Sequence, residues 1–401
     1  MRSEVAPLEI CQEIVEFSDG GRSFAVALIL RAEGSTPCKA GAKAVIEGTG
    51  KIWGTVGGGK VEAEAQRQAI AACRTKRPVV FDFHLEGADT GDAEPICGGT
   101  MRVLVDPTAA KDRAAYAQAA EAVAHRKRGV LLTSVRTPTE VGTAYAAFGA
   151  PPSGGKPTEA PPSGGKPTEV GTTYAEVTVQ WLAEGAASPA VGFPDADAIR
   201  ACLARETPQW LANQSHEAGE REEAFVEPVI PKPILLIVGG GHVGQALARQ
   251  AVLIGFDATV VDDRAEFTDP ALFPNGVTTR CGDVVKEVSG FPTAADTYIV
   301  IVTRGHQHDA EALRVCIHAP AAYIGMIGSR RKVALLRKTF VESGWATEDE
   351  FNRVFAPVGL DIGSVTVPEI ATSIVAQMIA VRRKGDAPRM GSQARPQYAK
   401  T

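Results

Sequence analysis

The chain has 401 residues, which is enough for two or three domains that each bury a core. Its 44% hydrophobic and 22% charged residues are ordinary for a globular protein, and the formal net charge is -5. The sequence contains no basic block, which argues against nucleic-acid binding, and no apolar run that approaches the length of a membrane span.

The N-terminal segment MRSEVAPLEICQEIVEF mixes acidic and apolar residues at helical spacing. This pattern predicts an amphipathic helix and not a signal peptide. The seven cysteines are scattered and form no C-x-x-C pair, so we expect neither a disulfide framework nor a structural zinc site. The cytoplasm is therefore the expected location.

The following segments predict a first α/β domain over residues 1–136. Strands are expected at FAVALIL, AVIEG, VVFDFHL and MRVLVD, and again at residues 129–135. Helical periodicity marks VEAEAQRQAIAACR and residues 113–126. Two loops rich in glycine interrupt this pattern, RAEGSTPCKAGAK and GADTGDAEPICGG.

The composition changes after residue 136. The decapeptide APPSGGKPTE occurs twice in succession, at 150–159 and 160–169, and such a Pro/Gly-rich repeat cannot bury a core. We expect a flexible insertion over residues 137–173 and assign it no function. Residues 174–232 should complete the first domain, with a helix near 195–213 and a polar linker that includes SHEAGEREEAF.

A glycine turn, GTVGGGKVE, occupies residues 54–62 and begins like a phosphate-binding loop, G-x-x-x-x-G-K. A nucleotide-hydrolysing loop needs Ser or Thr after the lysine to bind magnesium, and this chain has Val61. Two interpretations remain open: a cradle for another anionic ligand, and a tight strand-to-helix turn without a ligand.

The segment PILLIVGGGHVGQALARQAVLIGFDATVVDDR predicts a Rossmann-like domain over residues 233–385, before a disordered tail at 386–401. Gly239, Gly241 and Gly244 fit G-x-G-x-x-G between a buried strand and a helix, and Asp262 ends the next strand. A carboxylate there could bind a ribose hydroxyl of NAD. A scaffold with another ligand, or with none, is an equally open interpretation.

Two further loops of this domain follow strands, TRGHQHD and GSRRK, and open α/β sheets bind ligands at such loops. His306, His308 and Asp309 lack a third clustered histidine or cysteine, which favours helix capping by Asp309 over a metal site. The predicted fold class is α/β: an N-terminal α/β domain plus a C-terminal Rossmann-like domain with a doubly wound parallel sheet.

The chain resembles the XdhC/CoxI family, accessory factors that mature molybdenum hydroxylases of the xanthine dehydrogenase type. The matching segments are GSTPCKAGAK, GTVGGGKVE, ICGGTMRVLVDP, VEPVIPKP, VGGGHVGQALA, TRGHQHD, YIGMIGSRRK and APVGLDIGSVTVPEIATSIVAQMIAVR. The resemblance implies a chaperone that binds molybdenum cofactor (molybdopterin), assists its sulfuration with a cysteine desulfurase, and delivers it to the apo-subunit of a molybdenum hydroxylase. It implies a cofactor-binding protein more than a catalyst, and a homodimer is expected.

The resemblance also implies the residues of the site. In the first domain the candidates for cofactor binding are Ser35, Lys39, Lys43, Gly57, Gly58, Gly59, Lys60, Glu62, Cys97, Gly98 and Gly99, and in the second they are Gly239, Gly241, His242, Gly244, Asp262, Arg304, His306, Ser329 and Arg330. Cys97 is the candidate metal contact, because a thiol between glycines can reach molybdenum; a buried, inert cysteine is the alternative.

One position departs from the family. Cys38 stands where the family more often has arginine, so Lys39 or Lys43 must supply the missing charge, or Cys38 brings a second thiol toward the site. The rival function from another class is an NAD-dependent oxidoreductase that uses Gly239–Asp262, with His306 as acid and base.

Overall fold

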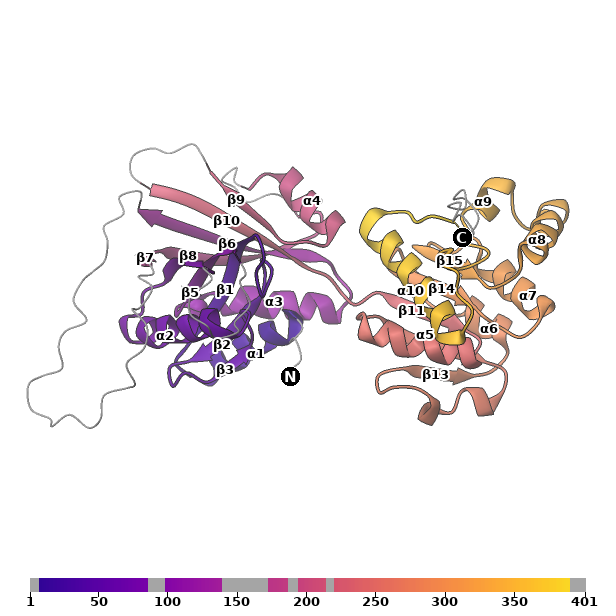
Figure 1. Cartoon of the computed structure of the whole chain (residues 1–401), viewed down its shortest axis with the longest axis horizontal. Helices are drawn as coiled ribbons and strands as arrows, with labels where there is room; N and C mark the ends of the chain where they lie inside the picture. The colour runs from indigo at the N-terminus through magenta and orange to yellow at the C-terminus, as the bar shows by residue number, and fades with distance from the viewer. Residues whose placement is uncertain (1–6, 86–97, 139–171, 187–193, 214–219, 390–401) are drawn as a thin grey trace, which may run out of the picture. The chain divides into compact units, whose positions relative to one another are not determined.

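The computed structural model describes residues 7–85, 98–138, 172–186, 194–213 and 220–389. The chain divides into two compact units, Met1–Pro231 and Lys232–Thr401 (Figure 1). Most of the expected repeat insertion and most of the expected tail lie outside the described residues.

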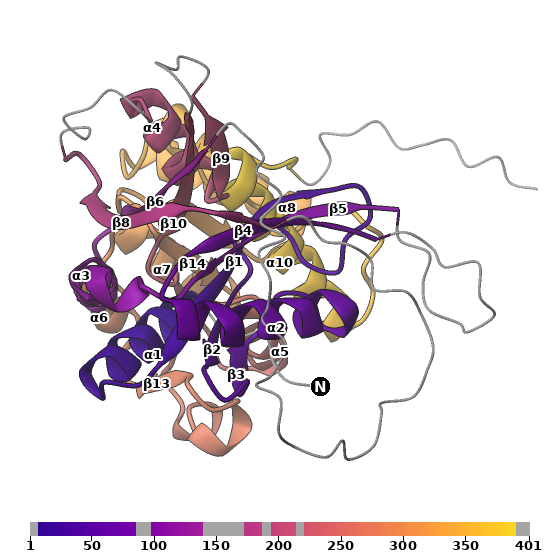
Figure 2. The ribbon, with the colours of Figure 1, turned by 90° about the vertical axis from the view of Figure 1, so that its left-hand side faces the viewer.

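The first unit contains an antiparallel sheet in the order β3-β2-β1-β5-β4-β7. Its strands are β1 (Phe24–Glu33), β2 (Lys43–Glu47), β3 (Ile52–Gly54), β4 (Val79–His84), β5 (Thr100–Asp106) and β7 (Thr172–Tyr174). The apolar side of α2 (Gly59–Thr75) packs on one face of this sheet, and α1 (Pro7–Asp19) and α3 (Arg113–Ala124) contribute to a core on the other (Figure 2). Strand alternation supplies both faces with apolar side chains.

A second antiparallel sheet, in the order β8-β6-β10-β9, completes this unit. It consists of β6 (Gly129–Pro138), β8 (Glu176–Ala183), β9 (Gln209–Ala212) and β10 (Glu220–Val229), with α4 (Ala196–Arg205) beside it. The expected helix near 195–213 thus ends at Arg205 and gives way to a strand. Apolar residues of both sheets meet in one cluster, which includes Leu28, Leu104 and Phe225.

Strand β10 replaces the expected linker. It is an inner strand, and its Glu223 and Glu227 are only 1% and 4% exposed. Each buried glutamate has a cation: Arg102 lies 3.2 Å from Glu223, and the ammonium of Lys43 lies 2.5 Å from Glu227. Glu223 also pairs with Arg221 of the same strand over 2.8 Å. The acidic composition indicated a solvated segment because Lys43 and Arg102 are distant in the sequence.

The second unit contains five parallel strands in the order β13-β12-β11-β14-β15, which confirms the predicted Rossmann-like sheet. The strands are β11 (Ile234–Val238), β12 (Asp257–Asp262), β13 (Thr278–Cys281), β14 (Thr297–Ile301) and β15 (Tyr323–Met326). The central strands are buried on both faces, as their continuous apolar runs predict.

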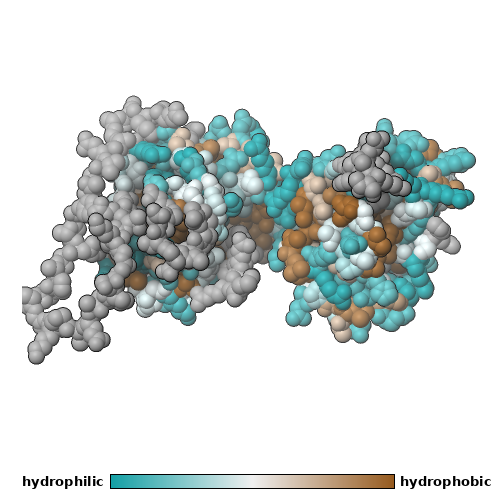
Figure 3. Space-filling view, in the orientation of Figure 1, coloured by the Kyte–Doolittle hydropathy of each residue, from teal (hydrophilic) through white to brown (hydrophobic). Residues whose placement is uncertain are grey.

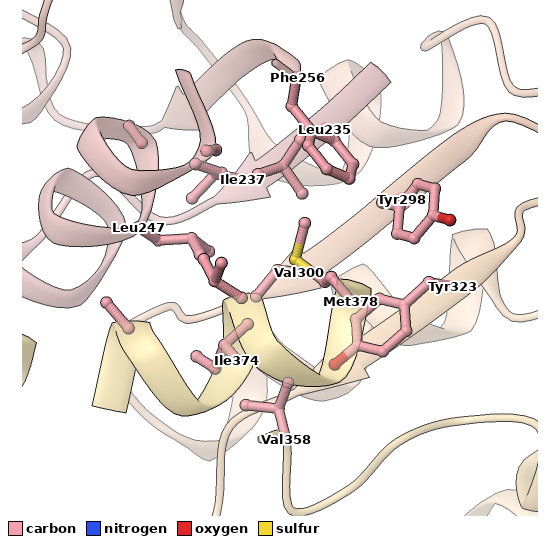
Figure 4. Packing of buried hydrophobic residues seen from close by; sticks show 14 of the residues in the cluster. Leu235, Ile237, Leu247, Phe256, Tyr298, Val300, Tyr323, Val358, Ile374 and Met378 are labelled. Carbon is pink, nitrogen blue, oxygen red and sulfur yellow. The ribbon is translucent and has the colours of Figure 1, made fainter. Parts of the chain in front are cut away.

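Helices cover both faces of the parallel sheet. The cluster around Leu247, Ile374 and Met378 joins α5 (His242–Leu253) and α10 (Val367–Lys384) to one face (Figure 4). The other face carries α6 (Val284–Ser289), α7 (His306–Cys316), α8 (Arg330–Glu342) and α9 (Glu348–Asn352). Because the five strands are parallel, their carboxyl ends lie at one edge of the sheet. The loops that precede α5, α7 and α8 meet at this edge.

On the face that Figure 3 shows, hydrophilic residues predominate outside the grey atoms, and apolar residues gather in smaller brown areas. Leu253 and Val365 are the most exposed large apolar side chains in the described part of the chain, at 84% each. Over the same residues, no helix combines the length and the apolar character that a membrane crossing requires.

Candidate functional site

The glycine turn of the first unit joins β3 to α2. Gly57, Gly58 and Gly59 all have positive φ, at 120°, 69° and 56°. A Cβ at Gly57 would lie 2.8 Å from Cγ of Pro37, whereas a Cβ at Gly58 or Gly59 would meet no atom within 4 Å. Gly57 is therefore required for packing against Pro37, while Gly58 and Gly59 present bare backbone at the N-terminus of α2, where amides lack intrahelical acceptors.

Two other glycine-containing loops meet at this turn. A Cβ at Gly34 would lie 2.8 Å from the carbonyl oxygen of Gly98, and one at Gly99 would collide with the carbonyl oxygen of Ser35. Because Pro37 of the same loop packs on Gly57, residues 34–38, 57–59 and 98–99 form one structural cluster. Three motifs that are separate in the sequence are thus brought together. Cys97 precedes Gly98 directly but lies outside the described residues.

Glu62 and Thr55 hold the glycine turn in place. The Thr55 hydroxyl donates to Oε2 of Glu62 over 2.7 Å, and the Gly58 amide donates to the same oxygen over 3.3 Å. The Gly57 amide donates to the Thr55 hydroxyl over 3.0 Å. Glu62, a candidate for cofactor binding from the sequence, therefore orients the turn, and Thr55 is a contributor that the sequence did not reveal.

The lysines of the first unit divide into two groups. Lys39 and Lys60 are exposed beside the turn and its neighbouring loop. Lys43 is buried in β2 and bound to Glu227; burial alone would lower the pKa of its ammonium, but the Glu227 carboxylate raises it. Because its charge is committed to Glu227, Lys43 does not replace the arginine absent at position 38. Cys38 is half-buried, and its side chain packs against the α2 side of the sheet.

In the second unit, the loops after β11 and β14 are in contact. A Cβ at Gly239 would lie 2.5 Å from the carbonyl oxygen of Val302, and Gly244 packs directly on Gly239. β11 and β14 are neighbours from the two halves of the sheet, so this contact marks its topological switch point. The N-termini of α5, α7 and α8 all lie at this edge, an arrangement that favours anions.

The candidate residues at this edge differ in their exposure and in the groups that they contact. His242 is exposed at the start of α5, and His306 starts α7, although its side chain lies outside the described part. Arg304 is 63% exposed and lies 4.0 Å from Asp263. Ser329 caps α8 by accepting the Lys332 amide, and Arg330 lies 3.6 Å from Asp361.

A buried ion pair joins two of these loops. Asp309 is fully buried; its Oδ1 accepts the Thr303 amide (3.2 Å) and hydroxyl (2.5 Å), and its Oδ2 binds the ammonium of Lys332. Asp309 therefore ties the loop after β14 to the first turn of α8. The sequence pointed to capping by Asp309 but gave no sign of Lys332 as its partner.

The carboxylate of Asp262, a candidate for binding a ribose hydroxyl, is engaged within its own unit. The residue is 3% exposed, and its Oδ2 accepts the Gly240 amide over 2.8 Å. The side chain of Arg264 donates to both carboxylate oxygens, over 2.9 and 3.0 Å, and its own amide donates over 3.1 Å. This carboxylate thus holds the glycine turn and binds Arg264, a partner that the sequence reasoning missed.

No group of three or more His, Cys, Asp or Glu side chains with metal-binding geometry occurs among the described residues. In the first unit the structure brings together Ser35, Gly57, Gly58, Gly59, Lys60, Glu62, Gly98 and Gly99. In the second it brings together Gly239, Gly241, His242, Gly244, Arg304, His306, Ser329 and Arg330. The side chain of Lys43 is bound to Glu227, and that of Asp262 to Arg264, so neither is available in these clusters.

Comparison with known families gives two matches. A model described as the XdhC Rossmann domain matches residues 235–378, and a model of the XdhC and CoxI family matches residues 18–84. These ranges contain both glycine turns and the loop 34–38, but not Gly98 and Gly99.

Similar proteins are found in two bacteria. The uncharacterized protein YqeB of Escherichia coli K12 is 35% identical over 167 residues, which are 41% of this chain and 30% of YqeB. A protein of Bacillus subtilis 168 that is named as a probable subunit of xanthine dehydrogenase is 31% identical over 40% of this chain and 46% of that protein. The molybdenum cofactor insertion chaperone PaoD of Escherichia coli K12 is 25% identical over 37% of this chain and 40% of PaoD. Each match spans less than half of the relative.

A crystal structure described as a xanthine dehydrogenase from Bacillus halodurans has the same fold. The superposition has a TM-score of 0.64 and covers 99% of this chain and 98% of the other, at 20% sequence identity. At this identity the likeness concerns the arrangement of helices and strands.

Proposed function

We propose that this chain, which belongs to the XdhC and CoxI family, binds molybdenum cofactor and assists the maturation of a molybdenum hydroxylase. The chaperone PaoD, a similar protein whose name describes insertion of this cofactor, supports the proposal. The observation that carries it is the meeting of residues 34–38, 57–59 and 98–99 in the first unit.

The chemistry of this cluster suits a phosphorylated pterin. The amides of Gly57 and Gly58 are bound to Thr55 and Glu62, so the backbone donors for a phosphate are those of the first turn of α2, which starts at Gly59. The exposed ammonium groups of Lys39 and Lys60 add to them. Gly58 and Gly59 leave room for close approach of a flat ring because no side chain covers them. Ser35, Gly98 and the carboxylate of Glu62 add polar groups for a pterin edge.

Cys97 enters the proposal through its position in the chain, next to Gly98. We propose that its thiol contacts the metal of the cofactor when the cofactor is bound, and that a cysteine desulfurase supplies sulfur to the complex. The other proposed partners are the apo-subunit of the hydroxylase and a second copy of this chain. These partners stay predictions, since each relative is matched over less than half of its length.

The test is direct purification. The full chain, isolated without oxygen from cells that make molybdenum cofactor, should contain molybdenum and release a pterin that becomes fluorescent on oxidation. It should also activate a purified apo-hydroxylase. A chain that carries neither molybdenum nor pterin, and that transfers no supplied cofactor, would contradict the proposal.

A further inference from the structure

The end of β12 differs from a dinucleotide-binding Rossmann domain in one respect. In such domains an acidic residue at this strand end accepts hydrogen bonds from the hydroxyls of the adenosine ribose. An ionised carboxylate offers about four acceptor positions on its two oxygens. The Gly240 amide, the Arg264 amide and the Arg264 side chain, which donates twice, together occupy this capacity on Asp262.

Arg264 is held in this position from several sides. Its guanidinium carbon lies 3.7 Å from the centre of the Phe267 ring, and its Nε lies 3.7 Å from a carboxylate oxygen of Asp263. The carbonyl of Phe267 in turn packs so closely on Gly240 that a Cβ there would collide with it. The 264–267 segment thus covers the carboxylate and lies against the glycine turn.

The charges of the pair reinforce each other. Burial alone would raise the pKa of Asp262, but Arg264 and the Gly240 amide hold it below its ordinary value. The carboxylate raises the pKa of Arg264 in return. Both groups therefore stay ionised near neutral pH, and a neutral diol must displace a charged, bidentate partner to reach Asp262.

We propose that Arg264 is a specificity-determining residue that closes the ribose subsite of the C-terminal unit, so that the glycine turn there rejects nicotinamide adenine dinucleotides. Removal of the side chain leaves Asp262 with two backbone donors, one on each oxygen, and frees one acceptor position on each. Two free acceptors on one carboxylate are what a ribose diol requires. This inference concerns NAD binding alone and does not depend on the proposed cofactor site of the first unit.

The experiment measures NADH binding to the full chain by fluorescence of the reduced nicotinamide. The wild-type chain should show no saturable binding up to on the order of 1 mM. Arg264→Ala should bind NADH at least about tenfold more tightly than this limit, because hydrogen bonds to a charged acceptor are gained. Arg264→Met, which keeps an apolar side chain over Phe267, should gain binding as well and covers the case in which the alanine variant does not fold.

Two controls define the result. Arg249→Ala removes an arginine of the same unit that donates to the Leu272 carbonyl, so it should leave NADH binding undetectable. Asp262→Asn in the Arg264→Ala background should abolish the gain, because the charged acceptor is lost. Saturable binding of NADH to the wild-type chain would overturn the inference. Failure of both Arg264 variants, once folded, to bind NADH would overturn it as well.

Discussion

Gly59 offers a comparison at the scale of one residue, because Gly21, in a turn of the same unit, matches it in backbone φ and in the space around the Cβ position. Their φ values are 56° and 60°, and a Cβ at either position meets no atom within 4 Å. Alanine should therefore cost each position a similar 1–2 kcal/mol, roughly, of backbone strain. Only the Cβ of Gly59→Ala would project into the space that we assign to the cofactor.

We predict that Gly59→Ala, isolated from cells that make the cofactor, contains several-fold less molybdenum per chain than Gly21→Ala. Metal analysis and oxidised-pterin fluorescence on equal amounts of folded protein measure the difference. Equal contents in the two variants would show that the glycine turn serves geometry alone.

Asp106 predicts a pH dependence of stability. Burial raises the pKa of its carboxyl from 3.8 to about 6, despite the hydrogen bonds that it accepts from the Thr108 amide and hydroxyl. Since the folded state holds the proton more tightly than the unfolded state, the first unit should lose stability as the pH rises through 4 to 6. The loss amounts to about 3 kcal/mol for a shift of about two units, and it persists at neutral pH.

Asp106→Asn keeps an acceptor for Thr108 and removes the charge. We expect its stability relative to the wild type to increase between pH 4 and pH 7, by up to about 3 kcal/mol. Denaturant unfolding at several pH values provides the measurement. Asp197→Asn, at an exposed carboxylate in the first turn of α4, is the matched control. A difference between Asp106→Asn and wild type that is constant with pH would contradict the assignment.

At the scale of elements, strand β10 depends on ion pairs that connect it to the other sheet. Lys43 begins β2 directly after the loop that packs on both glycine motifs, and its ammonium binds Glu227 of β10. Both side chains are 6% exposed, so the loss of one partner leaves a buried charge without compensation. Such losses cost about 3–5 kcal/mol, whereas replacing both charges by apolar groups is often close to neutral.

We therefore expect Lys43→Met and Glu227→Leu each to destabilise the first unit strongly, and the double variant to be more stable than either single variant. Three of the four tryptophans, Trp53, Trp181 and Trp210, lie in the first unit. Tryptophan fluorescence in a Trp345→Phe background thus follows the unfolding of this unit. Additive effects of the two substitutions would argue against a coupled pair.

The parts of the fold and of the site that could be predicted from the sequence are those whose signals are local in the chain. The parallel sheet of the second unit was predictable, because ILLIV, the three glycines and DATVV encode strand, turn and strand within one short segment. Strand β10 was not, because its buried Glu227 is tolerable inside only once Lys43, far away in the sequence, is in place, and Glu223 pairs with the distant Arg102 as well as with Arg221 of its own strand. Arg264 was missed for a different reason: its position beside Asp262 gives no sign of which group it binds.

At the scale of the whole molecule, the two units have separate cores and separate loop clusters. Every described member of the proposed cofactor site belongs to Met1–Pro231, and the Arg264 pair belongs to Lys232–Thr401. Each unit also has the size of an ordinary domain, large enough to bury its own core. The cofactor site and the closed ribose subsite should therefore be separable by cutting the chain between residues 231 and 232.

We predict that residues 1–231 and 232–401, produced as separate proteins, both fold, and that only the first retains molybdenum and pterin. Cooperative unfolding of each fragment tests folding, and metal analysis after anaerobic purification tests retention. Because all the donors that we propose for the phosphate and the pterin edge come from the first unit, its occupancy should stay within about twofold of the full chain, a difference of well under 1.4 kcal/mol. If both fragments fold but molybdenum is found only with the intact chain, groups of the second unit must complete the site, and the assignment to residues 34–38, 57–59 and 98–99 alone is wrong.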